Sequence, residues 1–184
     1  MNDFRIAVVG IGATGPVLAA ALLSKTPETI LVAPRQNLRE RLLEYGVNVS
    51  GVLSYHVPIR HVVARISDMK DLDPDIILLS TKTFNLRQVI DELKAVFRPG
   101  TKIVSTHNGL GTEDLIAESF GVQTALRMSL NFGASLKGPA DAAIAFFNKP
   151  NHLGGLSQEN REVGSQIAAL LTDCGLDTQF VDDI

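Results

Sequence analysis

The stretch Val8-Val9-Gly10-Ile11-Gly12-Ala13-Thr14-Gly15 is the most informative part of this chain, because it connects an apolar strand to a helix through three glycines. Gly10 permits the tight turn out of the strand, Gly12 lets the backbone approach phosphate groups, and Gly15 lets the helix pack close to the strand. The free N–H groups at the helix start, together with the positive end of its dipole, attract an anion. Residues 10–15 are therefore predicted to bind the pyrophosphate of a dinucleotide.

The composition of the chain narrows the class of protein. Its 184 residues suffice for one domain with a full core, and 45% hydrophobic and 20% charged residues are ordinary for a globular protein. A net charge of −3 argues against a nucleic-acid partner. The single cysteine, Cys174, suits a reducing compartment, and the N-terminal apolar run is too brief for a signal peptide or membrane span. We therefore expect a cytoplasmic protein that binds neither nucleic acid nor membrane.

Apolar strands alternate with helices along the chain, which predicts a parallel sheet covered on both faces. The expected strands cover residues 4–9, 29–33, 75–81, 101–106 and 177–181, and the expected helices cover 13–25, 37–45, 86–97, a segment from Thr112, and Val163 to Cys174. Short β-like pieces in residues 47–66 predict an antiparallel or crossover excursion, and residues 122–156 are expected to be rich in strand. The predicted fold class is α/β: one doubly wound domain, residues 1–184, with a mostly parallel, Rossmann-type sheet.

The end of the second strand indicates which dinucleotide binds. NAD enzymes usually place a carboxylate there for the ribose 2′-hydroxyl, whereas this strand ends Val32-Ala33-Pro34-Arg35 without one. The guanidinium of Arg35, twenty residues after Gly15, offers a bidentate partner for a 2′-phosphate. Arg39 and Arg41 follow, and the sequence leaves open whether they assist or only solvate a helix face. We therefore expect NADP(H) as the cofactor rather than NAD(H).

Several further segments follow the pattern of one family, in order along nearly the whole chain. They are the glycine loop 10–15, Arg35, Leu42-Leu-Glu-Tyr-Gly46-Val, Ser80-Thr-Lys82-Thr-Phe, His107-Asn108-Gly109-Leu110-Gly111, Phe132-Gly-Ala134 with Gly138-Pro139, and Val181-Asp-Asp-Ile184. Together they resemble the N-terminal domain of ketopantoate reductases (2-dehydropantoate 2-reductases). The segments around Lys82 and Asn108 make this resemblance specific.

The resemblance implies roles for residues beyond the glycine loop. Lys82 and Asn108 each follow the carboxyl end of a predicted strand, where an open α/β sheet forms its ligand crevice. In the family, the lysine at the Lys82 position lies by the nicotinamide side of the site, and the asparagine at the Asn108 position contacts cofactor and substrate. Ala134 matches a position that touches the cofactor through its backbone. Lys82 and Asn108 are therefore expected to bind substrate, and all three residues to bind cofactor.

The family's reaction is hydride transfer from NADPH to the ketone of 2-dehydropantoate, giving pantoate for coenzyme A synthesis. Such chemistry needs a proton donor for the developing alkoxide. The resemblance places that donor, a lysine, in a C-terminal helical domain beyond Ile184, so no catalytic residue is assigned within this chain. We expect the domain of an NADP-dependent 2-oxoacid reductase that binds NADPH and is nearly inactive alone. The alternative is a non-catalytic dinucleotide-binding sensor or interaction module.

Other residues carry weaker signals. The four histidines show no i, i+4 pairing and no second cysteine supports a zinc site, so no metal is expected. His107, beside Asn108, is expected to be an ordinary loop histidine, and Cys174 an inert core residue on an apolar helix face. The partner that the resemblance implies is a small 2-oxoacid similar to ketopantoate. The sequence leaves the exact oxoacid and a homodimer open.

Overall fold

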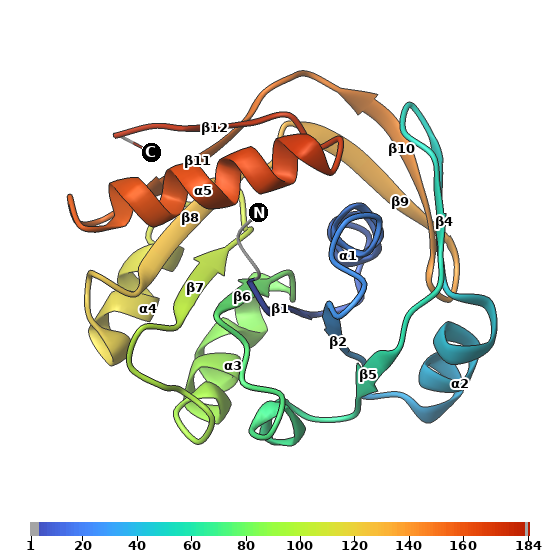
Figure 1. The fold of residues 1–184 in the computed structure, drawn as a ribbon, viewed down its shortest axis with the longest axis horizontal. Helices are drawn as coiled ribbons and strands as arrows, with labels where there is room; N and C mark the ends of the chain where they lie inside the picture. Colours follow the sequence, from blue (N-terminus) through green and yellow to red (C-terminus); the bar gives the residue numbers. More distant parts are fainter. Residues whose placement is uncertain (1–3, 183) are drawn as a thin grey trace.

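The computed structural model describes residues 4–182 and 184, and it contains two sheets and five α-helices (Figure 1). The larger sheet has eight strands in the order β12-β11-β8-β7-β6-β1-β2-β5. Its strands are β1 (Ile6–Val9), β2 (Ile30–Val32), β5 (His61–Val63), β6 (Ile76–Leu79), β7 (Lys102–Ser105), β8 (Ala125–Ser129), β11 (Asn151–Gly155) and β12 (Thr178–Phe180). Every neighbouring pair is parallel except β8 with β11. The predicted α/β fold with a mostly parallel sheet is confirmed.

Helices cover both faces of this sheet. One core lies under α1 (Gly15–Leu23) and α5 (Asn160–Asp173), and a second under α3 (Leu86–Leu93) and α4 (Thr112–Phe120). Strand β1 shows why the sequence predicted a buried strand: Ile6 and Val8 belong to the first core, and its other two residues to the second. A strand that is buried on both faces has no reason to alternate apolar with polar residues.

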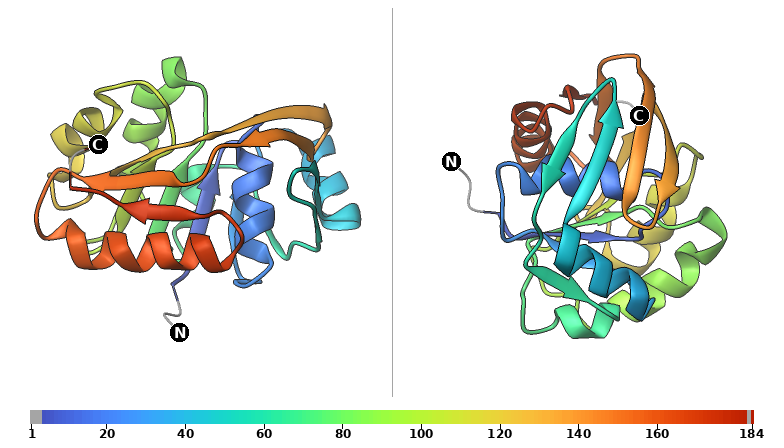
Figure 2. Two further views of the ribbon diagram at one scale, coloured as in Figure 1. Left: turned by 90° about the horizontal axis from the view of Figure 1, so that it is seen from above. Right: turned by 90° about the vertical axis from the view of Figure 1, so that its right-hand side faces the viewer.

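The smaller sheet has four strands in the order β4-β3-β10-β9, which are β4 (Tyr55–Val57), β3 (Val47–Gly51), β10 (Asp141–Phe147) and β9 (Phe132–Gly138). Strand β10 pairs in parallel with β3, and both have an antiparallel partner on their other side. Figure 2 shows the β9–β10 hairpin lying beside the strands of the 47–57 region. Strands were expected in both segments, but their union in one separate sheet was not. The remainder of the 47–66 segment contributes β5, which extends the large sheet beside β2.

Helix α1 lies between the two sheets, with the large sheet below it and the strands of the small sheet to its right and upper right (Figure 1). All nine of its residues are buried. A helix that is covered on every side is apolar all round rather than amphipathic, and the sequence Gly15-Pro-Val-Leu-Ala-Ala-Ala-Leu-Leu23 has that composition. Pro16 is accommodated in the first turn, where no intrahelical N–H bond is lost. The predicted helix is confirmed, with shorter ends.

Helix α2 (Gln36–Tyr45) connects the two sheets and ends where the sequence predicted. Gly46 follows it with φ of +71°, and a Cβ at this position would lie 2.2 Å from the carbonyl oxygen of Val57. Glycine is therefore required both by the backbone conformation and by the approach of β4.

Cys174, at the end of α5, is an inert core residue as expected. It is 3% exposed, and burial raises the pKa of its thiol to about 11. Within the residues that the structure describes, no helix is long and apolar enough to cross a membrane.

Candidate functional site

The glycine loop leaves β1 at the carboxyl edge of the large sheet and contacts the residue that follows β6. Gly10 has φ of +112°, and a Cβ there would lie 2.7 Å from the carbonyl carbon of Ser80. The hydroxyls of Thr14 and Ser80 are joined by a hydrogen bond of 2.6 Å. A Cβ on Gly15 would lie 2.1 Å from the carbonyl oxygen of Gly10, so the start of α1 is in backbone contact with the end of β1. Backbone packing therefore requires glycine at both Gly10 and Gly15.

Gly12 is in a different environment. A Cβ there would meet only the carbonyl oxygen of Ser80, at 3.9 Å, which is ordinary van der Waals contact. Packing within the described part of the chain therefore does not require glycine at this position, whereas the approach of a ligand to the backbone would. Ile11 and Ala13 are half-buried on either side of it.

No side chain caps the N-terminus of α1. Thr14 occupies the N-cap position, but its side chain makes no capping hydrogen bond, because its hydroxyl is bonded to Ser80. The first N–H groups of a helix have no intrahelical partner, and the positive end of the helix dipole lies at the same place. Residues 10–15 thus form a site that can hold a phosphate group.

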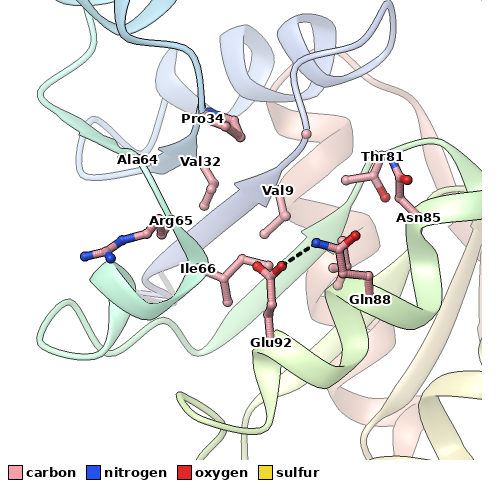
Figure 3. A pocket seen from close by; sticks show the side chains of 12 residues that line it. Val9, Val32, Pro34, Ala64, Arg65, Ile66, Thr81, Asn85, Gln88 and Glu92 are labelled. Carbon is pink, nitrogen blue, oxygen red and sulfur yellow. Dashed lines mark hydrogen bonds between the residues drawn. The ribbon is translucent and has the colours of Figure 1, made fainter.

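A cavity of about 350 Å³ opens beside Gly10, at the carboxyl ends of β1, β2, β5 and β6 (Figure 3). Apolar side chains and polar groups both line it: Val9, Gly10, Val32, Pro34, Ala64, Arg65, Ile66, Thr81, Asn85, Gln88, Val89 and Glu92. Gln88 donates a hydrogen bond of 2.9 Å to Glu92 within it. The cavity borders the β1–β6 boundary, where the strand order reverses, which is where open α/β sheets bind ligands.

Arg35 lies one residue beyond Pro34, which lines the cavity. It is exposed at the N-cap of α2, and its guanidinium has no hydrogen bond or ion pair within the described residues. Arg39 donates to the carbonyl oxygens of Ala33 and Pro34, at 3.0 and 2.7 Å. Of the arginines in this segment, Arg35 therefore has the guanidinium free to meet a ligand.

Arg41, by contrast, joins α2 to the small sheet. It pairs with Asp141 at 2.6 Å and donates to the carbonyl oxygen of Pro139 at 2.7 Å. The sequence left open whether Arg39 and Arg41 only solvate a helix face; both instead make specific contacts within the fold.

Lys82 and Asn108 lie at the carboxyl edge of the sheet, as predicted, because they follow β6 and β7. Lys82 is exposed at the start of a short 3₁₀ turn, Thr83–Asn85. Asn108 is also exposed, but its carboxamide is partly used: its Oδ1 accepts from the N–H of Leu130 at 3.0 Å, and its Nδ2 donates to the carbonyl oxygen of Leu130 at 3.3 Å. Asn108 therefore links the loop after β7 to the loop after β8, with one N–H left over.

Ala134 lies in the small sheet, in β9, where it pairs with Ile144. It is half-buried and packs against the same core cluster as Ile11 of the glycine loop. The small sheet thus brings Ala134 to the side of the large sheet on which the glycine loop and α1 lie.

His107 occupies the loop after β7, as expected, but it is buried rather than solvated, with 7% of its surface exposed. Its Nε2 is 2.8 Å from the carbonyl oxygen of Thr81, and its Nδ1 is 2.9 Å from Oγ of Ser105. Burial lowers the pKa of the imidazole, and the hydrogen bond to Thr81 opposes that change. No group of three or more acidic, histidine or cysteine side chains in residues 4–182 and 184 could hold a metal ion.

The sequence did not single out the polar residues of the cavity. Gln88 and Glu92 are spaced i, i+4 on α3, a pattern typical of a solvated helix face, and Arg65 lies in a segment whose pairing was not predicted. The packing of α3 against the sheet brings Gln88 and Glu92 to the cavity, and the pairing of β5 with β2 brings Arg65 there.

Comparison with protein families places these features in context. The family model described as Ketopantoate reductase PanE/ApbA matches residues 6–158 of this chain. The 2-dehydropantoate 2-reductase of Streptococcus pyogenes serotype M1 is 25% identical over 177 residues, which cover 96% of this chain and 56% of that protein. The 2-dehydropantoate 2-reductase of Lactococcus lactis is 25% identical over 183 residues, which cover 98% of this chain and 57% of that protein. The chain thus spans little more than half the length of these relatives.

Solved structures show the same fold. The 2-dehydropantoate 2-reductase of Geobacter metallireducens superposes with a TM-score of 0.86 at 22% identity, covering 97% of this chain and 58% of that one. A D-mandelate dehydrogenase in a ternary structure with NADH and anilino(oxo)acetate gives a TM-score of 0.84 at 22% identity, covering 98% and 57%.

Proposed function

Because the chain belongs to the ketopantoate reductase family, we propose that residues 1–184 form the NADP-binding domain of a 2-dehydropantoate 2-reductase. The reaction transfers a hydride from NADPH to the ketone of ketopantoate and yields pantoate, a precursor of pantothenate and coenzyme A. The observation that carries the proposal is the glycine loop. Gly12, whose lack of a Cβ is not required by packing, and the uncapped N-terminus of α1 form a site for the pyrophosphate.

The two halves of the dinucleotide extend in different directions from the glycine loop. With the pyrophosphate at residues 10–15, one half of the dinucleotide extends toward the cavity at the ends of β1, β2 and β5. The other half extends toward the ends of β6 and β7, where Lys82 and Asn108 lie. The cavity takes the adenosine half, because Arg35 adjoins it and offers a guanidinium to the 2′-phosphate. The nicotinamide half then lies near Lys82, Asn108 and Ala134.

Lys82 and Asn108 supply the polar contacts on the nicotinamide side. The ammonium of Lys82 carries three N–H donors for the oxygens of a 2-oxoacid, and Asn108 keeps one N–H beyond its bonds to Leu130. Both groups bind and orient the substrate against the reduced nicotinamide, which supplies the hydride. Neither is assigned as the donor of the proton that the alkoxide needs; we propose that this donor is a lysine beyond Ile184.

We therefore expect the 184-residue chain to bind NADPH with little turnover. The test is to titrate it with NADPH, following the nicotinamide fluorescence, and then to add ketopantoate and follow the nicotinamide absorbance. Binding with almost no loss of absorbance supports the proposal, and a chain extended to the length of the relatives should oxidise NADPH readily. A chain that binds no NADPH contradicts the proposal. Rapid turnover by the 184 residues contradicts the placement of the donor, and an extended chain that binds without turnover favours a binding module.

A further inference from the structure

His107 belongs to the loop after β7, and its side chain bonds to the backbone of the loop after β6. Its Nε2 lies 2.8 Å from the carbonyl oxygen of Thr81, the residue before Lys82, and His107 itself immediately precedes Asn108. A carbonyl oxygen only accepts hydrogen bonds, so Nε2 carries the proton and donates it. One buried side chain therefore connects the loop after β6 to the loop after β7.

Buried hydroxyls hold the other side of the imidazole. Oγ of Ser105 is 2.9 Å from Nδ1 of His107 and 2.8 Å from Oγ1 of Thr112, and both hydroxyl-bearing residues are at most 3% exposed. When the imidazole is neutral with its proton on Nε2, Nδ1 is an acceptor and the hydroxyl of Ser105 donates to it. This bond restrains the plane of the ring and hence the direction of the Nε2–H bond.

A buried ion pair completes the support of the same loop. Glu113 and Arg127 are 6% and 5% exposed, with Oε2 3.8 Å from Nε. Nη2 of Arg127 donates to the carbonyl oxygen of Asn108 at 3.5 Å, and Oγ1 of Thr112 donates to Glu113 at 3.2 Å. The backbone of Asn108 is thus held by two buried neighbours, His107 before it in the chain and Arg127 at its carbonyl oxygen, although its own side chain is exposed.

We propose that His107 is a positioning residue of this site: its hydrogen bond to Thr81 fixes the loop that carries Lys82 relative to the loop that carries Asn108. The inference rests on the proposed function, because these two residues are the expected contacts of the nicotinamide half. His107 is 7% exposed and acts through the backbone of Thr81. Thr81 itself lines the cavity, whereas Lys82 and Asn108 do not.

Two substitutions separate the two hydrogen bonds of the imidazole. In His107→Gln the side-chain amide reaches the place of Nε2 and can still donate to Thr81. In His107→Asn the shorter amide occupies the place of Nδ1, keeps the contact with Ser105 and loses Thr81. We expect His107→Asn to weaken NADPH binding about tenfold, the equivalent of one hydrogen bond, and His107→Gln to change it less than about twofold.

The control ligand is adenosine 2′,5′-bisphosphate, which lacks the nicotinamide half. His107→Asn should change the binding of this ligand less than about twofold, because the ligand does not extend to Lys82 and Asn108. A general loss of structure would weaken the binding of both ligands. Thermal unfolding of the variant measures such a loss directly. Equal NADPH affinity in His107→Asn and the unsubstituted chain overturns the positioning role and leaves the proposed function intact. Failure of the unsubstituted chain to bind either ligand overturns the proposed function itself.

Nitrogen-15 NMR of the unsubstituted chain provides a test that does not depend on the folding of a variant. Long-range correlations of the imidazole should show the neutral tautomer with its proton on Nε2 near pH 7, with and without NADPH. A proton on Nδ1 alone would remove the donor to Thr81 and overturn the proposal.

Discussion

The carbonyl oxygen of Gly10 and the α-carbon of Gly15 are so close that a Cβ on Gly15 would lie 2.1 Å from that oxygen. The end of β1 and the start of α1 are therefore in direct backbone contact, and this contact fixes the direction in which α1 presents its N–H groups. At Gly12, by contrast, the protein atom nearest to an added Cβ would be the carbonyl oxygen of Ser80, at 3.9 Å.

Substitutions at these two glycines should affect different properties, stability at Gly15 and NADPH binding at Gly12. We expect Gly15→Ala to lower the free energy of unfolding by about 2 kcal/mol or more, since the backbone must shift. Gly12→Ala should cost less than about 1 kcal/mol of stability and yet weaken NADPH binding at least about tenfold, because the methyl group occupies the space of the phosphates. Urea unfolding and fluorescence titration measure the two quantities. A Gly12→Ala variant that binds NADPH normally would contradict the placement of the pyrophosphate.

Arg35 should set the preference for NADPH. Arg35→Ala removes a charged hydrogen-bond donor, so we expect NADPH affinity to fall at least about tenfold and NADH affinity to change less than about twofold. Arg41→Ala is the matched control, because it removes the same charge from the same helix while its guanidinium is already paired with Asp141. Titrations with both nucleotides test this prediction. The 2′-phosphate assignment fails if Arg35→Ala and Arg41→Ala bind NADPH equally well.

Glu113 should stabilise the fold through Arg127. Glu113→Gln leaves the buried guanidinium of Arg127 without its carboxylate, which is expected to cost about 3 kcal/mol in the free energy of unfolding. Glu118→Gln, on the exposed face of the same helix, is the control and should cost less than about 0.5 kcal/mol. The double variant Glu113→Gln, Arg127→Met should recover part of the loss. Equal stabilities of the two single variants would show that the pair contributes nothing.

His107 should make the stability depend on pH. Burial lowers its pKa from the usual value of 6.5, so in the folded chain the imidazole stays neutral to a lower pH than in the unfolded chain. Below about pH 6.5 the unfolded state therefore binds more protons, and the free energy of unfolding falls as the pH decreases. His107→Gln has no group that titrates there and should lose less stability between about pH 7 and about pH 5.5. Urea unfolding at both pH values compares the two proteins, and parallel losses would argue against a buried, neutral His107.

Much of the fold follows from local patterns. The spacing of Gly10, Gly12 and Gly15 predicts the dinucleotide loop. The unbroken apolar strand Ile6–Val9 indicates burial on both faces, and Gly46 marks the end of α2. Lys82 and Asn108 could be placed at one edge of the sheet because parallel strands end on the same side. These inferences succeed because each depends on neighbours in the chain or on a rule that all parallel sheets obey.

The small sheet could not be obtained in this way. An alternating pattern indicates a strand but does not indicate which strand it pairs with. Strand β3 pairs with the distant β10, where Val49 lies opposite Ala142. Arg41 illustrates the consequence, because its role depends on Asp141 at the start of that distant strand. The sequence could only leave its role open.

The buried contacts that support the site also depend on the pairing of distant segments. His107 looks like a loop residue until β6 and β7 lie side by side and bring Thr81 to its Nε2, and Arg127 meets Glu113 only once α4 packs beside β8. Short-range patterns of glycine, charge and hydrophobicity thus establish that a dinucleotide loop is present and where its strands end. The contacts that hold that loop's neighbours in place join segments far apart in the chain, so they exist only after the chain has packed.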